Sequence, residues 1–409
     1  MTRGVPSRAY LRGSRMKAVD FDRAPFLVIW ETTQSCALVC RHCRASAQPK
    51  RDPQELTTEE GLRVVRQTAD MGTPLLIFTG GDPVNRSDLC ELIRAGRAAG
   101  LRTATIPAAT DCLTRDLLAR LKDAGVDQVA FSLDFPDVAR HDAFRGVPGA
   151  YDKTMAAIGW AHSLGIPLQI NTTVCGDTAP ALEAMAAFVQ QAGIVFWEVF
   201  FLVPMGRGTL LQGLTAAQCE ELFEVIWRVQ RKGDFIVKVT EAPHYRRYVA
   251  QRVGEVPGPG SGVPGHPHGH PGTANGKPET GNQKPETHSG IHMPKILTRS
   301  EGPGHTVGLA PRGVNSGNGF LFVSHTGGIF PSGFLPVPGG SVRTSTLADV
   351  YRDSELFRTL RTPDLLKGRC GRCEYRSICG GSRSRAFALT GDWMQTDPWC
   401  GYQPKGGRA

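Results

Sequence analysis

Between Phe26 and Val203, short apolar runs alternate with amphipathic segments, and this alternation restricts the fold more than any other feature of the chain. The apolar runs are rich in β-branched and aromatic residues and are bounded by Gly or Pro, which predicts strands. Strand–helix alternation predicts a parallel sheet with right-handed crossovers. Six such units predict an α/β fold, a partial (β/α)6 TIM-like barrel with its functional residues at the C-terminal ends of the strands. The six runs are FLVIWETT, PLLIFTGG, LRTATIP, VDQVAFSLD, IPLQINTTV and IVFWEVFFLVP.

Residues 254–306 differ sharply in composition from the segments on either side. They contain 12 Gly and 9 Pro and have almost no apolar periodicity. Such a segment cannot bury enough apolar surface to offset the conformational entropy that ordering would cost. We therefore predict a disordered insertion over residues 251–308, following a helix at Thr215–Lys232. Its HPHGH run at 266–270 leaves metal binding open beside the simpler interpretation of low-complexity drift.

The other segments complete a predicted four-part organisation. A basic leader at 1–20 lacks the apolar stretch of a secretory signal, and the barrel spans 21–250. We expect residues 309–409 to form a small separate domain, with a β-hairpin in GFLFVSHTGGIFPSG and one helix in TLADVYRDSELFRTLR. No run approaches the ~18 consecutive apolar residues of a membrane span. We therefore expect a cytoplasmic protein with no membrane partner.

The formal net charge of +9 is partly local to the C-terminal region. Six basic residues there face a single acidic one, Glu374. Two interpretations remain open, a solvated surface and a basic lid over an anionic substrate or cluster. Nucleic acid is not an expected partner, because aromatic residues do not alternate with the basic ones. The six basic residues are Lys367, Arg369, Arg372, Arg376, Arg383 and Arg385.

The 11 cysteines point to metal or redox chemistry, because thiols in the cytoplasm stay reduced. Seven of them fall into two groups. The first group is C-x3-C-x2-C, directly after the first predicted strand, at Cys36, Cys40 and Cys43. The four cysteines outside the groups are predicted to be small buried side chains. These are Cys90, Cys112, Cys175 and Cys219.

Three neighbouring thiols suit a cation that prefers sulfur. Structural zinc normally takes four protein ligands in a closed tetrahedron, and no fourth cysteine occurs before Cys90. His42 is adjacent to Cys43 and cannot easily complete the same site. An iron–sulfur cubane held by three cysteines would leave one iron open to a substrate or cofactor. Zinc remains the alternative.

The motif and its place after the first strand of a partial barrel resemble the radical S-adenosylmethionine (SAM) superfamily. The resemblance implies that Cys36, Cys40 and Cys43 bind a [4Fe–4S] cluster whose open iron is chelated by SAM. Reductive cleavage of SAM then yields a 5′-deoxyadenosyl radical that abstracts a hydrogen atom from the substrate. His42 stands where the family usually has an aromatic residue or a histidine.

Polar motifs at later strand ends resemble the SAM contacts of the same family. TGGDP (79–83) is similar to the GGE-type motif, with Asp82 in place of the usual Glu, and glycine lets a backbone approach a ligand closely. The motif VPMGRG (203–208) resembles the adenine- and carboxylate-contacting region. A structural role at the strand ends is the alternative for every single residue. The implied SAM contacts are Gly80, Gly81, Asp82, Ser132, Asp134 and Asn171.

The second cysteine group resembles the C-terminal SPASM or twitch domain of radical SAM enzymes. Four thiols suffice to close a cubane, so the resemblance implies one auxiliary [4Fe–4S] cluster. Two ligand positions of a further auxiliary cluster hold Ser332 and Arg383, which excludes that cluster. Electron transfer and a structural role remain open, and zinc is the alternative, although its sites more often have two C-x2-C pairs. The four thiols belong to Cys370, Cys373, Cys379 and Cys400.

Within the superfamily, the chain looks like the branch of haem and haem d1 biosynthesis enzymes, which remove or oxidise propionate side chains of tetrapyrroles. This resemblance implies a radical SAM oxidoreductase that acts on a tetrapyrrole and takes electrons from a flavodoxin or ferredoxin. A maturase of a ribosomally made peptide is the alternative, and a non-enzymatic iron–sulfur electron carrier is the third. No catalytic side chain and no substrate contact is assigned. The resemblance rests on TTQSCALVCRHCRASA, TGGDP, SLDFPD…HDAFRG and GRCGRCEYRSICGGSRSRA.

Overall fold

The structure is a computed structural model that describes residues 19–232, 235–254 and 313–405. The predicted insertion at 251–308 lies outside these residues except for its first four positions. The predicted leader at 1–20 lies outside them except for its last two.

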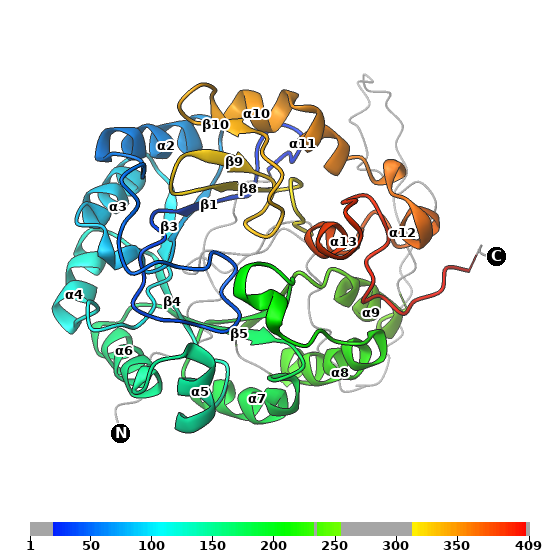
Figure 1. Cartoon of the computed structure of the whole chain (residues 1–409), viewed down its shortest axis with the longest axis horizontal. Coiled ribbons are helices and arrows are strands. Elements are labelled where there is room, and N and C mark those ends of the chain that lie inside the picture. The colour runs from blue at the N-terminus through cyan, green and yellow to red at the C-terminus, as the bar shows by residue number, and fades with distance from the viewer. Residues whose placement is uncertain (1–18, 233–234, 255–312, 406–409) are drawn as a thin grey trace, which may run out of the picture.

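The predicted partial barrel is confirmed, and its strands run parallel in chain order around a curved sheet (Figure 1). Each strand is short, and nearly all of its residues are buried or half-buried. The six predicted strands are β1 (Leu27–Glu31), β2 (Leu75–Thr79), β3 (Arg102–Thr105), β4 (Gln128–Ser132), β5 (Leu168–Val174) and β6 (Phe196–Phe201).

Four further strands extend the sheet at both edges. Strand β7 (Ile236–Thr240) pairs in parallel with β6, and β8 (Phe320–Val323) pairs in parallel with β1. The predicted hairpin is confirmed, because β9 (Gly328–Phe330) runs antiparallel to β8. Strand β10 (Gly340–Ser341) pairs with β9 and ends the ten-stranded order β10-β9-β8-β1-β2-β3-β4-β5-β6-β7.

Helices cover the outer side of the sheet (Figure 1). Helix α2 begins at a capping box, in which Thr57 and Glu60 each accept a hydrogen bond from the backbone of the other. The predicted helix at Thr215–Lys232 is confirmed as α8. The helices of this region are α2 (Thr58–Asp70), α3 (Leu89–Ala98), α4 (Arg115–Asp123), α5 (Val138–Arg145), α6 (Ala150–Leu164), α7 (Leu182–Gln191), α8 (Ala216–Lys232) and α9 (His244–Arg252).

The single helix predicted in TLADVYRDSELFRTLR is wrong. The segment forms two helices, because Ser354 has an extended backbone (ψ 139°) and its hydroxyl accepts a hydrogen bond from the Phe357 N–H. A serine that caps a new helix in this way competes with continuation of the old one. The C-terminal helices are α10 (Leu347–Asp353), α11 (Glu355–Leu360), α12 (Gly368–Arg372) and α13 (Arg383–Thr390).

The barrel and the C-terminal region share one sheet, which crosses the domain boundary expected at residue 309. Strand β8 belongs to the C-terminal region, yet it pairs with β1. Figure 1 shows α12 and α13 on the open side of the barrel, between the β8–β10 edge and the α8–α9 edge, while α10 and α11 lie beyond β10, with α10 beside α2. Hydrogen bonds hold this segment in place, as from Arg385 to the Leu202 carbonyl and from Tyr351 to the Phe21 carbonyl.

The prediction that the four cysteines outside the two groups are buried has a mixed outcome. Cys175 and Cys219 are buried as predicted and Cys90 is half-buried, but Cys112 is exposed, so the prediction of burial is wrong for it. Among the helices of the described residues, none combines the length and apolar character that a membrane span requires.

Candidate active site

A cavity of about 350 Å³ occupies the inside of the barrel and the C-terminal ends of its strands. Cys36, Cys40 and Cys43 line it, and their loop follows β1. The backbone N–H groups of Gly81 and Asp82 donate to carbonyls of the cysteine loop at 2.7 Å each. The loops after β1 and β2 therefore form one hydrogen-bonded unit at the edge of the cavity.

Each sulfur of the first cysteine group accepts a hydrogen bond from an N–H group. The donors are the Leu38 backbone to Cys36 (3.3 Å), the Ala47 backbone to Cys43 (3.5 Å) and the Arg145 guanidinium to Cys40 (3.7 Å). Burial nevertheless raises the pKa of Cys36 to about 12, so its thiolate form needs a bound cation. Three sulfurs from one loop at the cavity, each with an N–H donor, fit the open iron–sulfur cluster that the motif predicts.

Gly80 and Gly81 line the cavity, and their lack of a side chain is required by the cysteine loop. A Cβ on Gly80 would lie 2.4 Å from the Thr33 carbonyl oxygen, and one on Gly81 would lie 2.5 Å from that of Ser35. The close approach predicted for these glycines is therefore made to the loop that carries the cysteines. Any larger residue would displace that loop.

Asp82 is fully buried and is not among the residues that line the cavity. Its carboxylate accepts hydrogen bonds from the Thr110 hydroxyl at 2.7 Å and the Ala108 N–H at 3.2 Å. It also caps the short 3₁₀ turn at Pro83–Asn85. Asp82 thus holds the loops after β2 and β3 together, and its role is structural.

Asp134 is also fully buried and does not line the cavity, but it forms an ion pair with Arg145, which does. Its carboxylate lies 2.5 Å from the Arg145 guanidinium and accepts a hydrogen bond from the Thr173 N–H at 2.8 Å. Burial, the largest single cause, raises the pKa of Asp134, but Arg145 and the weaker effects of its other neighbours together outweigh burial and lower the pKa overall. His42 stacks on Phe144, and burial lowers its pKa to about 4, so it is neutral near pH 7.

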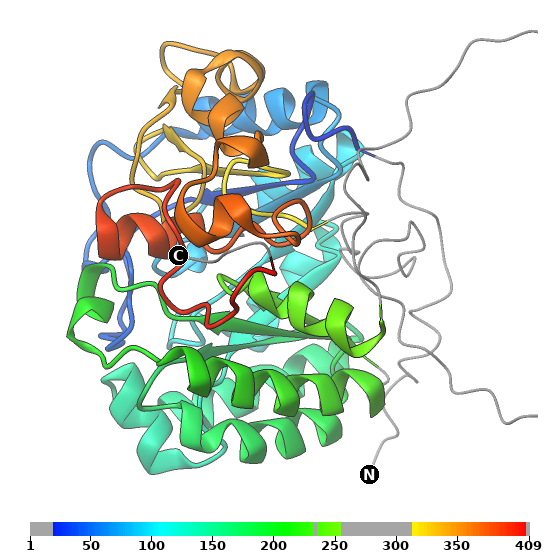
Figure 2. The same ribbon diagram turned by 90° about the vertical axis from the view of Figure 1, so that its right-hand side faces the viewer.

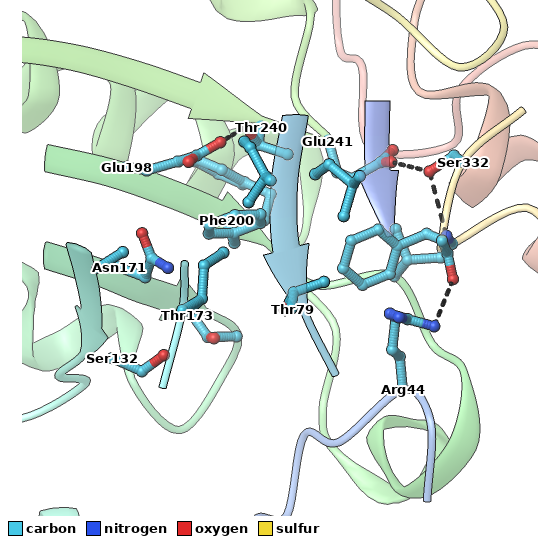
Figure 3. Close-up of a pocket in the computed structure, with 18 of the residues that line it drawn as sticks. Arg44, Thr79, Ser132, Asn171, Thr173, Glu198, Phe200, Thr240, Glu241 and Ser332 are labelled. Carbon is cyan, nitrogen blue, oxygen red and sulfur yellow. Dashed lines mark hydrogen bonds between the residues drawn. The ribbon is translucent and has the colours of Figure 1, made fainter. Parts of the chain in front are cut away.

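Ser132 and Asn171 line the cavity; Ser132 ends β4 as expected, whereas Asn171 lies in the middle of β5. Figure 3 shows them on one side of the cavity with Glu198, and Glu241 and Ser332 on the other. The Asn171 side chain accepts a hydrogen bond from Gln169 at 2.7 Å. These two side chains are therefore available to a ligand inside the barrel.

Sequence reasoning missed Glu198, Lys238 and Glu241, all of which line the cavity. Lys238 donates to Glu198 at 2.7 Å across the β6–β7 pair. Strand β7 was missed altogether, although its IVKVT run has the β-branched residues of a strand. That run could have identified β7 and, with it, Lys238 in the strand and Glu241 directly after it.

Glu241 follows β7 with an unusual backbone, because its φ of 58° lies in the left-handed region. Hydroxyl groups surround its carboxylate, from Ser382 at 2.5 Å, Ser384 at 2.9 Å and Ser332 at 3.4 Å. Burial raises its pKa more than these hydrogen bonds lower it. Ser332, which stands at a predicted position of a missing cluster ligand, thus contacts a buried carboxylate.

The second cysteine group lines a separate small cavity. The Gly381 N–H donates to the Cys379 sulfur at 3.4 Å, and Arg383 donates to the Cys370 sulfur at 3.7 Å. No three Cys, His, Asp or Glu side chains among the described residues converge as a single metal ion requires. Four thiols suffice to close a cubane, and four thiols also suffice for a structural zinc site. The four lining thiols are those of Cys370, Cys373, Cys379 and Cys400.

The basic stretch near the C-terminus does not cover the large cavity, so the interpretation of a lid over a substrate there is wrong. Arg369 and Arg376 line the small cavity of the second cysteine group instead. Arg385 is fully buried and pairs with Asp397 at 2.8 Å, and Arg383 is buried beside Cys370. Arg376 pairs with Asp364 and Lys367 with Asp392 at the surface. None of the six basic residues is among those that line the large cavity.

Comparison with known proteins agrees with this geometry. The family model described as "Radical SAM superfamily" matches residues 30–189. The AdoMet-dependent heme synthase of Nitratidesulfovibrio vulgaris is 37% identical over 381 residues, 93% of each chain. The AdoMet-dependent heme synthase of Methanosarcina barkeri is 35% identical over 386 residues, 94% of this chain and 99% of that one.

A solved structure supports the fold. SuiB of Streptococcus suis bound to S-adenosylmethionine has a TM-score of 0.64 at 15% identity, over 93% of this chain and 78% of SuiB. A likeness at this identity concerns the fold alone. Together with the close relatives, it confirms the resemblance expected from the C-x3-C-x2-C motif. The chain belongs to the radical SAM superfamily, whose enzymes use a [4Fe–4S] cluster and SAM.

Proposed function

We propose that this radical SAM enzyme modifies carboxylate-bearing side chains of a tetrapyrrole in haem synthesis. The relatives at 37% and 35% identity are named AdoMet-dependent heme synthases. The observation that carries the proposal is the cavity itself, which joins the three-cysteine loop to walls that include Phe200, Phe322 and Phe334. Apolar aromatic walls suit a flat macrocycle, and basic side chains at the same cavity suit its carboxylates.

The residues divide into those that would hold cofactors and those that position them. Cys36, Cys40 and Cys43 bind the first cluster, and the backbone of Gly80 and Gly81 receives SAM. When bound there, the cluster and SAM supply a carbon-centred radical for hydrogen abstraction. Ser132 and Asn171 are the proposed polar contacts to SAM. Asp82 and Asp134, which we expected to be contacts, act by fixing the loops and Arg145.

We further propose that the second cysteine group binds one auxiliary [4Fe–4S] cluster and accepts the electron that oxidation of the substrate releases. Residues of the C-terminal segment line its small cavity, and Figure 2 shows this segment beside the open side of the barrel. A ferredoxin or flavodoxin of the cytoplasm is the proposed reductant for the first cluster. The thiols of both groups suit that compartment, where they stay reduced.

The test is substrate-dependent cleavage of SAM. Anaerobically reconstituted protein, reduced with dithionite, is incubated with SAM and iron coproporphyrin, and 5′-deoxyadenosine and porphyrin masses are measured. We expect deoxyadenosine to rise with the porphyrin and the porphyrin mass to fall. The matched control is the Cys36→Ala/Cys40→Ala/Cys43→Ala variant, which should form neither product.

A peptide substrate is the competing outcome of this test. SuiB has been solved with its precursor peptide SuiA, and it shares the fold of this chain. Deoxyadenosine formation stimulated by candidate peptides and not by the porphyrin would reject the tetrapyrrole proposal. Cleavage of SAM without either substrate would support neither candidate over the other and would direct the search to other carboxylates.

A further inference from the structure

The basic side chains that line the large cavity are neutralised by carboxylates, with one exception. Arg44 pairs with Glu31, Arg145 with Asp134 and Lys238 with Glu198, at 2.5, 2.5 and 2.7 Å respectively. The exception is Arg246 in the first turn of α9, which also lines the cavity. Among residues 19–232, 235–254 and 313–405, no carboxylate lies within 4.0 Å of its guanidinium.

The contacts of Arg246 leave its charge uncompensated. Its guanidinium donates to the Val314 carbonyl at 2.5 Å and to the Ile378 carbonyl at 3.2 Å. Both acceptors are neutral, and the remaining N–H groups have no acceptor among the described residues. Burial lowers the pKa of Arg246, opposed only in part by the nearby Cys379 thiol. Buried charges in proteins are normally paired, so this guanidinium lacks a carboxylate partner among the described residues.

The surrounding backbone makes room for the guanidinium at the cavity wall. A Cβ on Gly313 would lie 2.4 Å from a terminal nitrogen of Arg246. Ile378, whose carbonyl Arg246 contacts, directly precedes Cys379 of the second cysteine group. Arg246 therefore stands between the large cavity and that group, and its planar set of N–H donors matches a carboxylate.

We propose that Arg246 binds a carboxylate of the substrate and so determines its specificity, an inference that rests on the tetrapyrrole function proposed above. The carboxylate belongs to a propionate-type side chain. It supplies the missing counter-charge and holds one edge of the substrate on the wall next to the second cysteine group. The first cysteine group lines the same cavity, so a macrocycle anchored at Arg246 is held between the two.

The experiment compares iron coproporphyrin with its fully esterified methyl ester, which keeps the macrocycle and removes the negative charges. Binding of both to the reconstituted protein is followed by absorbance titration for the wild type, Arg246→Gln and Arg246→Lys. We expect Arg246→Gln to weaken binding of the acid roughly tenfold to a hundredfold, as loss of a charged hydrogen-bonded contact does. Its binding of the ester should match that of the wild type, and Arg246→Lys should recover part of the loss.

A matched control and a second readout separate this role from a structural one. Arg252→Gln removes an exposed arginine of the same helix, paired with Glu224, and should leave both titrations unchanged. The midpoint potential of the second cluster, measured by electron paramagnetic resonance, tests whether Arg246 serves that cluster instead. A shifted potential with unchanged acid binding in Arg246→Gln overturns the inference.

The remaining outcomes are also decisive. Equal losses for the acid and the ester in Arg246→Gln overturn the inference, because the charge of the substrate then plays no part. A wild type that binds neither porphyrin overturns the tetrapyrrole function, and the inference with it. If the wild type binds the acid well and only the Arg246 variants give an unexpected result, the inference fails while the tetrapyrrole function stands.

Discussion

Asp134 and Arg145 form a buried ion pair, with 2.5 Å between carboxylate and guanidinium, and Arg145 also donates to the Cys40 sulfur at 3.7 Å. The pair connects the segment after β4 to the cysteine loop after β1. The sequence presents Asp134 as a ligand contact, and the structure makes it the partner of a residue that reaches the cluster loop. Asp134 therefore acts on the site indirectly, through Arg145.

Removal of the Asp134 charge should destabilise the protein and loosen the cluster. Asp134→Asn leaves Arg145 buried without a counter-charge, which costs roughly 3–5 kcal/mol in the free energy of unfolding. Urea unfolding and iron content after gel filtration measure the two effects. Glu183→Gln, which breaks an exposed pair with Arg228, should change stability by less than about 1 kcal/mol. Similar small effects for both variants would contradict the role of the buried pair.

Iron content should separate the two cysteine groups. Anaerobic reconstitution should give about eight irons per chain in the wild type and about four in the Cys36→Ala/Cys40→Ala/Cys43→Ala variant, one cubane for each group. Cys112→Ala, at an exposed cysteine outside both groups, should keep the wild-type value. About four irons in the wild type and almost none in the triple variant would reject the auxiliary cluster. An unchanged triple variant would reject the first one.

A methyl group at Gly81 should disable the site without replacing any of the cluster-binding cysteines. Its Cβ would lie 2.5 Å from the Ser35 carbonyl oxygen, so Gly81→Ala must displace the cysteine loop, at about 1–3 kcal/mol. We expect loss of 5′-deoxyadenosine formation together with reduced iron retention. Gly159→Ala is the matched control, since nothing lies within 4 Å of its added Cβ in α6. Normal SAM cleavage by Gly81→Ala would show that the loop tolerates the shift.

The buried carboxyl of Glu241 should make stability depend on pH. Burial raises its folded-state pKa above the ordinary value of 4.5, so the neutral acid is the form that folding favours. The unfolding free energy of the wild type should therefore fall, relative to Glu241→Gln, as the pH rises from about 4.5 through the folded-state pKa. Urea unfolding of both proteins between pH 5 and 8.5 measures this difference. A stability of the wild type relative to Glu241→Gln that stays constant, or that rises with pH, would contradict the predicted burial effect.

Much of the barrel could be predicted because its signals are local. The strands β1 to β6 and the helix α8 lie where runs of β-branched residues and helical periodicity place them. Strand β7 was missed because Lys238 and Thr240, which line the cavity, interrupt its apolar run. The C-terminal hairpin was predicted correctly, but its pairing with β1 was not, because pairing between strands far apart in sequence produces no local sequence pattern.

The spacing of the cysteines in the sequence indicates the cluster chemistry of the chain, whereas the tertiary structure decides which groups neighbour each side chain. C-x3-C-x2-C brings three thiols into one loop whatever the rest of the fold does, so the motif alone indicated a cluster and a family. Asp82, Asp134 and Arg385 look like contacts or surface charges in the sequence, yet all three are fully buried with partners from other segments. The unpaired charge of Arg246 became visible in the same way. Whether a charged group is neutralised depends on groups that only folding brings within hydrogen-bonding distance.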